Sequence, residues 1–329
     1  MRSVVKPALA GAIALLAVVV LAACGSSSSK SSASGASSAA SGTSSSSSAA
    51  SGGSSQPGKG KPTIVLGDKN FTEEYILGDL YQQALQAKGY TVTLKPNIGS
   101  SELTDKALTS GQIQMYPEYT GVILSVLKGQ ANVPVSAAAT YAAAKTFEAG
   151  RGYTLLDPTP FQDRDVTIAL KAFAAKNHLT SMEDLKKLPS FTNGGPPENR
   201  TRYEGLVGMH QAYHLNNVQF VPLTIGLQYQ ALDSGKVDTA QGFTTDGQLA
   251  SGKYALLDDP KHIYGFQQIA PVVSNKLLQQ EGPAFAQTLN ALDAKLTNEV
   301  MQKLNAAVVL DKVDAATVAK EFLKANGLS

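Results

Sequence analysis

The 329-residue sequence has one cysteine, no tryptophan and four histidines, and its formal net charge is only +2. A single cysteine excludes a disulfide within the chain and a zinc site built from several thiolates. The small net charge provides no basic field that would attract nucleic acid. No apolar run reaches the roughly 20 residues that a membrane-spanning helix needs. Disulfide-stapled folds, polyanion binding and integral membrane proteins are therefore disfavoured.

The N-terminus has the pattern of a secretory signal. Arg2 and Lys6 precede an apolar run over residues 8–23, which ends in Leu-Ala-Ala directly before Cys24. A basic segment, an apolar segment and small residues before a cut site are typical of a cleaved leader. The pattern resembles a bacterial lipoprotein leader, so we expect residues 1–23 to be removed and Cys24 to carry a lipid. The alternative is an uncleaved anchor helix, and either anchor places the remaining chain at the extracytoplasmic face of the cell membrane.

Residues 24–61 are rich in serine, glycine and alanine. Such a segment has no large apolar side chains to bury and behaves as a random coil. About 35 residues of this kind span about 30 to 35 Å. We expect a flexible tether, although a low-complexity spacer without a selected length has the same composition.

The remaining residues, 62–329, show alternating strand and helix patterns. Short apolar or alternating runs predict strands, and amphipathic runs predict helices. The first group comprises residues 63–67, 72–87, 90–94, 101–110 and 113–116, and the second comprises 166–170, 182–188, 205–214, 218–221 and 226–234. Residues 277–328 have helical spacing throughout. This order predicts an α/β protein with two lobes, a mostly parallel sheet in the first and C-terminal helices packed on one lobe.

Several short runs, in order along the chain, resemble one protein family. They are Gly67-Asp68-Lys69-Asn70-Phe71-Thr72-Glu73-Glu74, Gly99-Ser100-Ser101, Tyr116-Pro117-Glu118-Tyr119-Thr120-Gly121, Gly194-Gly195-Pro196-Pro197-Glu198, Arg202, Tyr229-Gln230-Ala231-Leu232, Thr244-Thr245-Asp246-Gly247 and Ala270-Pro271-Val272-Val273. The set resembles the substrate-binding proteins of osmoprotectant ABC importers, which capture glycine betaine, choline, carnitine and related quaternary amines. The resemblance implies a two-lobed type II periplasmic-binding-protein fold. Lobe 1 is then expected over residues 62–162 plus 272–329, and lobe 2 over residues 163–271.

Aromatic rings are the expected ligands of a quaternary ammonium. Such a cation cannot donate hydrogen bonds, so a protein selects it with ring faces, each contact contributing about 0.5 to 2 kcal/mol. Because the chain has no tryptophan, tyrosine and phenylalanine must supply the rings. The resemblance points to Tyr119, Phe243 and Phe266, with Tyr264 as a further ring. It also places Thr120 and Thr244 at the ligand, although core packing is the alternative role for each ring.

Cationic side chains are the expected partners of a betaine carboxylate. Arginine suits this task because its guanidinium forms a rigid fork. The resemblance puts Arg202 and Lys69 at these positions, while Arg200 is an alternative to Arg202 and an exposed surface role is an alternative for Lys69. Two residues depart from the family pattern, which often has threonine at Val122 and tyrosine at Asp165. Asp165 adds a negative charge that suits a cation without a carboxylate, or it pairs with Arg164 or Arg202 and shapes a different pocket.

Other classes of function are less well supported by the sequence. His210 and His214 have the i, i+4 spacing of a metal site, but Gln211 stands where a zinc protease has glutamate. No Gly-x-Ser-x-Gly motif and no phosphate-binding loop is present. We therefore expect no catalytic residues, no metal and no cofactor, and an extracellular hydrolase, a surface adhesin or a binding protein for a non-betaine solute remain the alternatives. The expected partners are a small solute and the permease and ATPase of an importer, with the chain as a monomer.

Overall fold

The computed structural model describes residues 56–130, 134 and 136–329. The predicted signal peptide, Cys24 and most of the predicted tether lie outside these residues. In the part of the chain that is described, no helix is long and apolar enough to cross a membrane.

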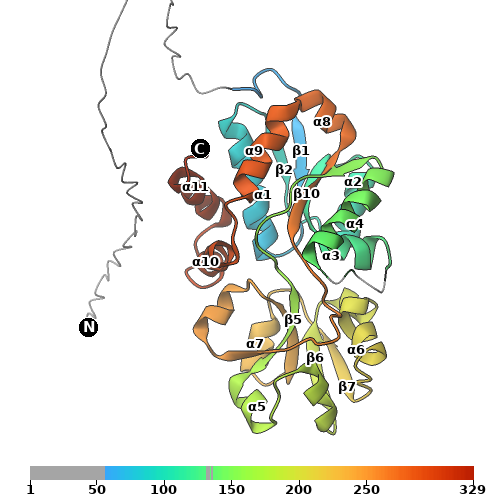
Figure 1. The fold of residues 1–329 in the computed structure, drawn as a ribbon. Coiled ribbons are helices and arrows are strands. Elements are labelled where there is room, and N and C mark those ends of the chain that lie inside the picture. Colours follow the sequence, from blue (N-terminus) through green and yellow to red (C-terminus); the bar gives the residue numbers. More distant parts are fainter. Residues whose placement is uncertain (1–55, 131–133, 135) are drawn as a thin grey trace, which may run out of the picture. The chain divides into compact units, whose positions relative to one another are not determined.

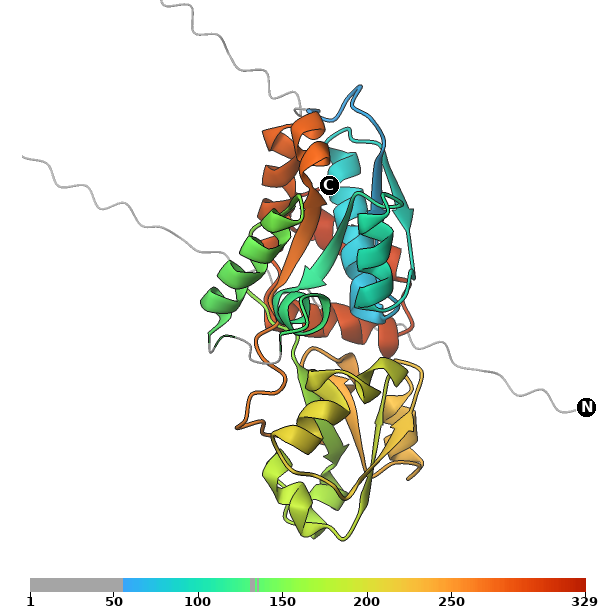
Figure 2. The same ribbon diagram turned by 90° about the vertical axis from the view of Figure 1, so that its right-hand side faces the viewer.

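The first lobe is built on a five-stranded mixed sheet in the order β2-β1-β3-β10-β4. β1 (Ile64–Gly67) pairs in parallel with β2 (Val92–Lys95) and β3 (Met115–Tyr119), whereas β10 (Ile269–Ser274) runs antiparallel to β3 and β4 (Tyr153–Leu155). Successive side chains of a strand face opposite sides of its sheet. Met115 therefore joins the apolar cluster of helix α1 (Thr72–Ala87), and Tyr116 joins a second cluster under α4 (Ala137–Gly150). Figure 2 shows helices on both sides of this sheet.

The second lobe repeats the arrangement with the strand order β7-β6-β8-β5-β9. β6 (Phe191–Gly195) pairs in parallel with β7 (Val218–Pro222) and β8 (Thr239–Phe243). β5 (Asp165–Leu170) runs antiparallel to β8 and β9 (Tyr254–Leu257). Each sheet thus has four strands that run in one direction and one reversed strand, β10 in the first lobe and β5 in the second.

The chain crosses between the lobes twice, before β5 and before β10 (Figure 1). The two crossing segments are paired, with a bridge between Gln162 and Gln268 and a hydrogen bond of 3.1 Å from the Asp163 amide to the Gln267 carbonyl. β10 begins at Ile269, whereas the sequence pattern predicts the return to lobe 1 at residue 272. The strand therefore includes three residues that the sequence pattern assigns to lobe 2.

The remaining helices cover the two sheets. They are α2 (Ser101–Thr109), α3 (Thr120–Val122), α5 (Lys171–Lys176), α6 (Gly208–Gln211), α7 (Gln228–Asp233), α8 (Asn275–Glu281), α9 (Pro283–Asp293), α10 (Asn298–Val309) and α11 (Ala315–Ala325). The C-terminal helices α9 and α11 pack against α1 of lobe 1. Helix α10 contacts both α1 and the 3-10 helix Gly247–Ser251 of lobe 2. It therefore bridges the two lobes at a place separate from the crossing segments.

The structure confirms most of the predicted elements and shortens several of the predicted helices. The helix over residues 72–87 is confirmed at both ends, and Ser181 caps the helical turn Met182–Lys187, although this turn is a 3-10 helix. The helix predicted over residues 205–214 is shorter, because α6 ends at Gln211 and His214 adopts a positive φ of 54°. His210 and His214 consequently do not share a helix.

Candidate functional site

A pocket, called the cleft pocket below, lies between the two lobes. The carboxyl-terminal ends of the parallel strands of both sheets supply much of its lining, as expected for open α/β sheets. Tyr119 ends β3, Phe243 ends β8, and Lys69 follows β1 by two residues. The lining consists of Lys69, Asn70, Phe71, Ser100, Ser101, Tyr119, Val122 and Gln267, together with Asp163, Asp165, Pro196, Glu198, Asn199, Arg202, Glu204, Ile225 and Phe243 from lobe 2. Five of the predicted ligand residues, Lys69, Tyr119, Asp165, Arg202 and Phe243, are thus brought together.

Three aromatic rings form a row in the cleft pocket. Phe71 stacks on Tyr119, with 6.1 Å between centroids and 29° between planes, and on Phe243 from lobe 2, with 5.5 Å and 13°. Phe71 lies within the first motif, but the sequence alone does not distinguish it as a ring of the site. The row therefore extends across both lobes.

Lys69 is buried, and its positive charge is paired with carboxyl groups of the protein. Its Nζ donates a hydrogen bond to Glu118 Oε1 and lies 3.6 Å from Glu74 Oε1. The same ammonium lies 4.2 Å from the centroid of the Tyr119 ring, within cation–π range. Glu118 and Glu74 hold this charge in place, so Lys69 is not a free partner for a ligand carboxylate.

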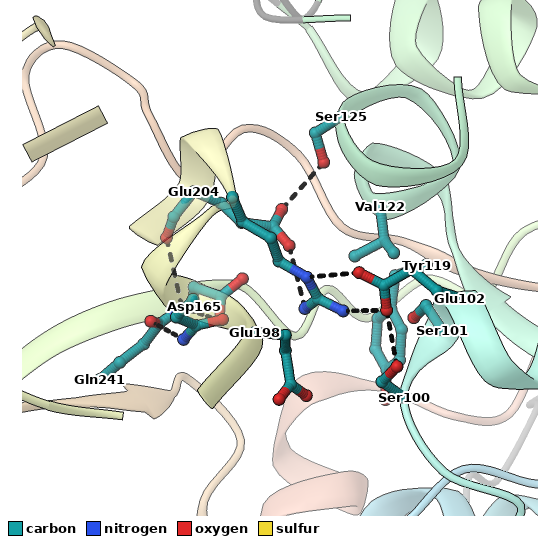
Figure 3. A network of polar contacts seen from close by, with 12 residues as sticks. Ser100, Ser101, Glu102, Tyr119, Val122, Ser125, Asp165, Glu198, Glu204 and Gln241 are labelled. Carbon is teal, nitrogen blue, oxygen red and sulfur yellow. Dashed lines mark hydrogen bonds and ion pairs between the residues drawn. The ribbon is translucent and has the colours of Figure 1, made fainter. Parts of the chain in front are cut away.

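Arg202 makes an ion pair that joins the lobes. Its Nη2 and Nε donate to the two carboxylate oxygens of Glu102 in α2, at 2.7 and 3.1 Å, and its Nη1 lies 3.5 Å from Glu204 Oε1. Glu204 also accepts a hydrogen bond of 2.9 Å from Ser125 Oγ of lobe 1. Figure 3 shows Glu102 with its bond from Ser100, and Glu204 with its bond from Ser125. This guanidinium, which the sequence assigns to a ligand carboxylate, is occupied by carboxylates of the protein.

Carboxyl groups outnumber cationic groups in the lining. Asp163, Asp165, Glu198 and Glu204 face Lys69 and Arg202. Burial, then the charge of Glu204, raises the pKa of Asp165 to about 8, although hydrogen bonding from Gln241 and the charge of Arg202 oppose the shift. Burial likewise raises the pKa values of Asp163 and Glu204. A bound cation would favour the ionised forms of these acids, so the lining suits a positively charged solute.

The other predicted site residues lie elsewhere. Thr120 is buried and its Oγ1 donates to the Phe266 carbonyl at 3.3 Å. Thr244 and Phe266 line a separate cavity beside the crossing segments. Tyr264 is buried with its hydroxyl 2.6 Å from Thr167 Oγ1, and the exposed Arg200 lies over the ring of Phe220. The two residues that depart from the family pattern, Val122 and Asp165, both line the cleft pocket.

The ion pair between Glu102 and Arg202 gives a prediction for stability. Burial of Glu102 raises its pKa, but the hydrogen bonds and charge of Arg202 prevail and lower it to about 2. A carboxyl whose folded pKa lies below its unfolded value stabilises the fold at neutral pH, and this contribution disappears as pH falls toward 2. Since Glu102 is half exposed, we expect Glu102→Gln to cost only about 1 kcal/mol at pH 7 and almost nothing near pH 2. Urea unfolding at both pH values checks this, and an equal loss at both would contradict it.

Two lobes with a charged aromatic pocket between them define a solute-binding protein of the periplasmic-binding class. A family model described as the substrate binding domain of ABC-type glycine betaine transport systems matches residues 62–325. The chain therefore belongs to this family of substrate-binding proteins of osmoprotectant importers, as the sequence motifs predict.

Individual relatives agree with this assignment. The chain is 31% identical to a glycine-betaine-binding protein of Pseudomonas aeruginosa, over 81% of this chain and 88% of the relative. It is 28% identical to a carnitine transport binding protein of Listeria monocytogenes, over 82% of this chain and 88% of the relative. A solved structure named as a glycine betaine/carnitine/choline ABC transporter is 26% identical, with a TM-score of 0.66, and covers 80% of this chain and 99% of that one. These relatives are transport proteins rather than enzymes, and the predicted two-lobed α/β fold is confirmed.

Proposed function

We propose that the cleft pocket captures a quaternary ammonium solute and that the protein delivers it to an ABC permease. The observation that supports this most strongly is the combination of three rings, Tyr119, Phe71 and Phe243, with an excess of carboxyl groups in one pocket. Rings attract a cation without requiring hydrogen bonds from it, and buried acids supply the counter-charge. Glycine betaine, choline and carnitine all carry the required trimethylammonium group.

Within this class, choline and other cations without a carboxylate fit better than glycine betaine. A betaine carboxylate needs fixed positive donors. Of the described residues that line the pocket, Lys69 and Arg202 are the cationic ones, and both are engaged by protein carboxylates. Val122 provides an apolar side chain where the family often has a hydroxyl. The second candidate function is the binding of a different small cation, not related to betaine, by the same fold. The carboxyl group of Asp165 in the pocket favours it.

The cellular setting follows from the family. Substrate-binding proteins of ABC importers act outside the cytoplasm and hand their solute to membrane-embedded subunits. We propose that Cys24 carries the lipid that anchors this chain, after removal of residues 1–23, and that residues 24–61 tether a monomeric binding body without catalytic activity.

Isothermal titration of the purified full-length chain with glycine betaine, choline, carnitine and ectoine tests the proposal. We expect binding of at least one trimethylammonium compound, with choline tightest. Tyr119→Ala is expected to weaken it about 10- to 30-fold, since one cation–π contact contributes up to about 2 kcal/mol. Tyr153→Ala, in β4 and outside the pocket lining, is the matched control and should leave affinity unchanged. The absence of binding by all four compounds would overturn the proposal.

A further inference from the structure

A buried carboxyl group outside the cleft pocket links three parts of the molecule. Glu73, in the first turn of α1, is only 3% exposed. Its Oε1 accepts a hydrogen bond of 2.9 Å from the Tyr119 hydroxyl, and its Oε2 accepts bonds of 2.6 Å from Thr245 Oγ1 and 2.9 Å from Asn305 Nδ2. Tyr119 belongs to lobe 1, Thr245 to lobe 2 and Asn305 to α10. One carboxyl group therefore contacts a ring of the pocket, the opposite lobe and the bridging helix.

The amide of Asn305 reinforces this link. Its Nδ2 also donates to the Thr245 carbonyl at 3.0 Å, so one amide group contacts Glu73 of lobe 1 and the backbone of lobe 2. α10 packs against both α1 and the 3-10 helix Gly247–Ser251, which begins two residues after Thr245. The contact is consequently held by helix packing as well as by hydrogen bonds.

Glu73 depends on these three donors. No ion pair of Glu73 is found among the described residues, and the acids Asp163 and Asp246 lie near enough for repulsion between their charges. Burial raises the pKa of Glu73, whereas the bonds from Thr245, Asn305 and Tyr119 and the charge of Lys69 lower it. A buried acceptor that loses its donors costs far more than an exposed one. If lobe 2 moved away from lobe 1, Glu73 would lose the hydrogen bond from the Thr245 hydroxyl. The hydrogen bond that holds the Tyr119 ring would then be disturbed as well.

We propose that Glu73 is a positioning residue, which holds the ring of Tyr119 in its binding orientation only while Thr245 and Asn305 join lobe 2 to it. Glu73 itself does not line the cleft pocket. Its effect on the ligand passes through Tyr119, so solute binding and the contact between the lobes favour each other. The inference rests on the proposed function for the identity of the solute, but not for the existence of the link.

Three variants of the full-length chain test the link in titrations with choline. Tyr119→Phe keeps the ring and removes only the hydroxyl that reaches Glu73, while Thr245→Val and Asn305→Ala remove the other two donors. We expect each to weaken binding about tenfold, and the double variant Tyr119→Phe with Thr245→Val to weaken it by much less than a hundredfold, because both act through one carboxyl group. Thr140→Val and Asn290→Ala, whose side chains bond within lobe 1, are the matched controls and should retain wild-type affinity.

The unfolding free energy of each variant separates positioning from simple stabilisation. A purely structural role would lower stability and leave the affinity of the folded molecules unchanged. Wild-type affinity in Thr245→Val and Tyr119→Phe, for a solute that the wild type binds, would overturn the inference.

Hydrogen exchange of the ligand-free chain tests the link around Glu73 without any solute. We expect Thr245→Val to accelerate exchange both in the first turn of α1 and in α10, because these segments meet at Glu73, whereas Thr140→Val should not. If no quaternary amine binds but this acceleration is seen, the proposed function fails and the link stands. If exchange is unchanged in both segments, the link fails regardless of the solute.

Discussion

Replacing Lys69 by methionine is expected to lower the free energy of unfolding by about 3 to 5 kcal/mol at pH 7. The ammonium of Lys69 pairs with Glu118 and Glu74, whose side chains are fully buried. Methionine retains much of the apolar stem but leaves the buried carboxyl groups of Glu118 and Glu74 without their cation. Breaking a buried pair from one side is costly because the remaining charge stays out of water. Urea unfolding at pH 7 measures the loss.

The loss should become smaller in acid. Burial raises the pKa of Glu74 well above its usual range even in the presence of Lys69, whose charge opposes the shift. A carboxyl whose folded pKa exceeds its unfolded value penalises the folded state above the unfolded pKa, and the penalty decreases as pH falls toward that value. We therefore expect Lys69→Met to approach the wild type near pH 4.5. Lys303→Met, which breaks an exposed pair with Glu299, is the control and should leave the free energy of unfolding almost unchanged. A loss for Lys69→Met that does not depend on pH would contradict this explanation.

The affinity for a quaternary ammonium should rise strongly with pH, by about 100-fold between pH 6 and pH 9. Burial, reinforced by Glu204, raises the pKa of Asp165 in the empty pocket to about 8. A cationic solute favours the ionised form, so binding below pH 8 must release a proton, and affinity falls about tenfold for each pH unit. Choline has no group that titrates in this range, which makes it the appropriate probe. Isothermal titration in buffers of different ionisation enthalpy measures both affinity and proton release.

The variant Asp165→Asn should give weaker binding and a much flatter pH profile. The groups that act on Asp165 are Glu204, Arg202 and the amide of Gln241, and Tyr264 lies close enough to sense its charge. Of these, Glu204 also has a raised pKa, so a small residual slope is expected in the variant. Equal slopes in Asp165→Asn and the wild type would show that the proton leaves from another group.

The same shift in Asp165 affects the stability of the ligand-free fold. Between its unfolded pKa near 4 and its folded pKa of about 8, the folded chain binds a proton that the unfolded chain does not. The contribution of Asp165 to stability is therefore largest in acid and decreases as pH rises through this window. Glu102 has the opposite sign, because its folded pKa is lowered.

Periodicity and short motifs were sufficient to predict most of lobe 1 and the fold class. No sequence pattern predicts the strands β6 and β8 of lobe 2, because their sequences, Phe-Thr-Asn-Gly-Gly and Thr-Ala-Gln-Gly-Phe, contain glycine and amides instead of an apolar run. Both strands are nevertheless mostly buried, and Asn193 and Gln241 have partners there from distant segments. Long-range hydrogen bonding allows polar residues in a sheet core, and no local pattern reveals it.

The pocket residues illustrate the same limit. Tyr119, Asp165 and Phe243 can be selected from the sequence because the family resemblance points to their positions. The role of Lys69 could not, since its partner Glu118 lies 49 residues away in the sequence and the pairing depends on the adjacent strands β1 and β3. Similarly, the engagement of Arg202 depends on Glu102 from the other lobe. Sequence motifs identify several side chains that line the cleft pocket, but ion pairing decides which of their charges are available to a ligand.

The paired crossing segments make the second lobe an insertion whose two ends are held next to each other. Gln162 and Gln268 form the bridge at this junction. The chain therefore leaves lobe 1 and returns to it at one point, with about one hundred residues of lobe 2 in between. Segments with adjacent ends can be inserted into a host domain, provided that contacts such as Glu102 with Arg202 are matched. Recombination at this junction would replace Asp165, Arg202 and Phe243 together and leave Lys69, Phe71 and Tyr119 in place. New solute preferences can therefore arise in this architecture by transplanting one half of the pocket as a module.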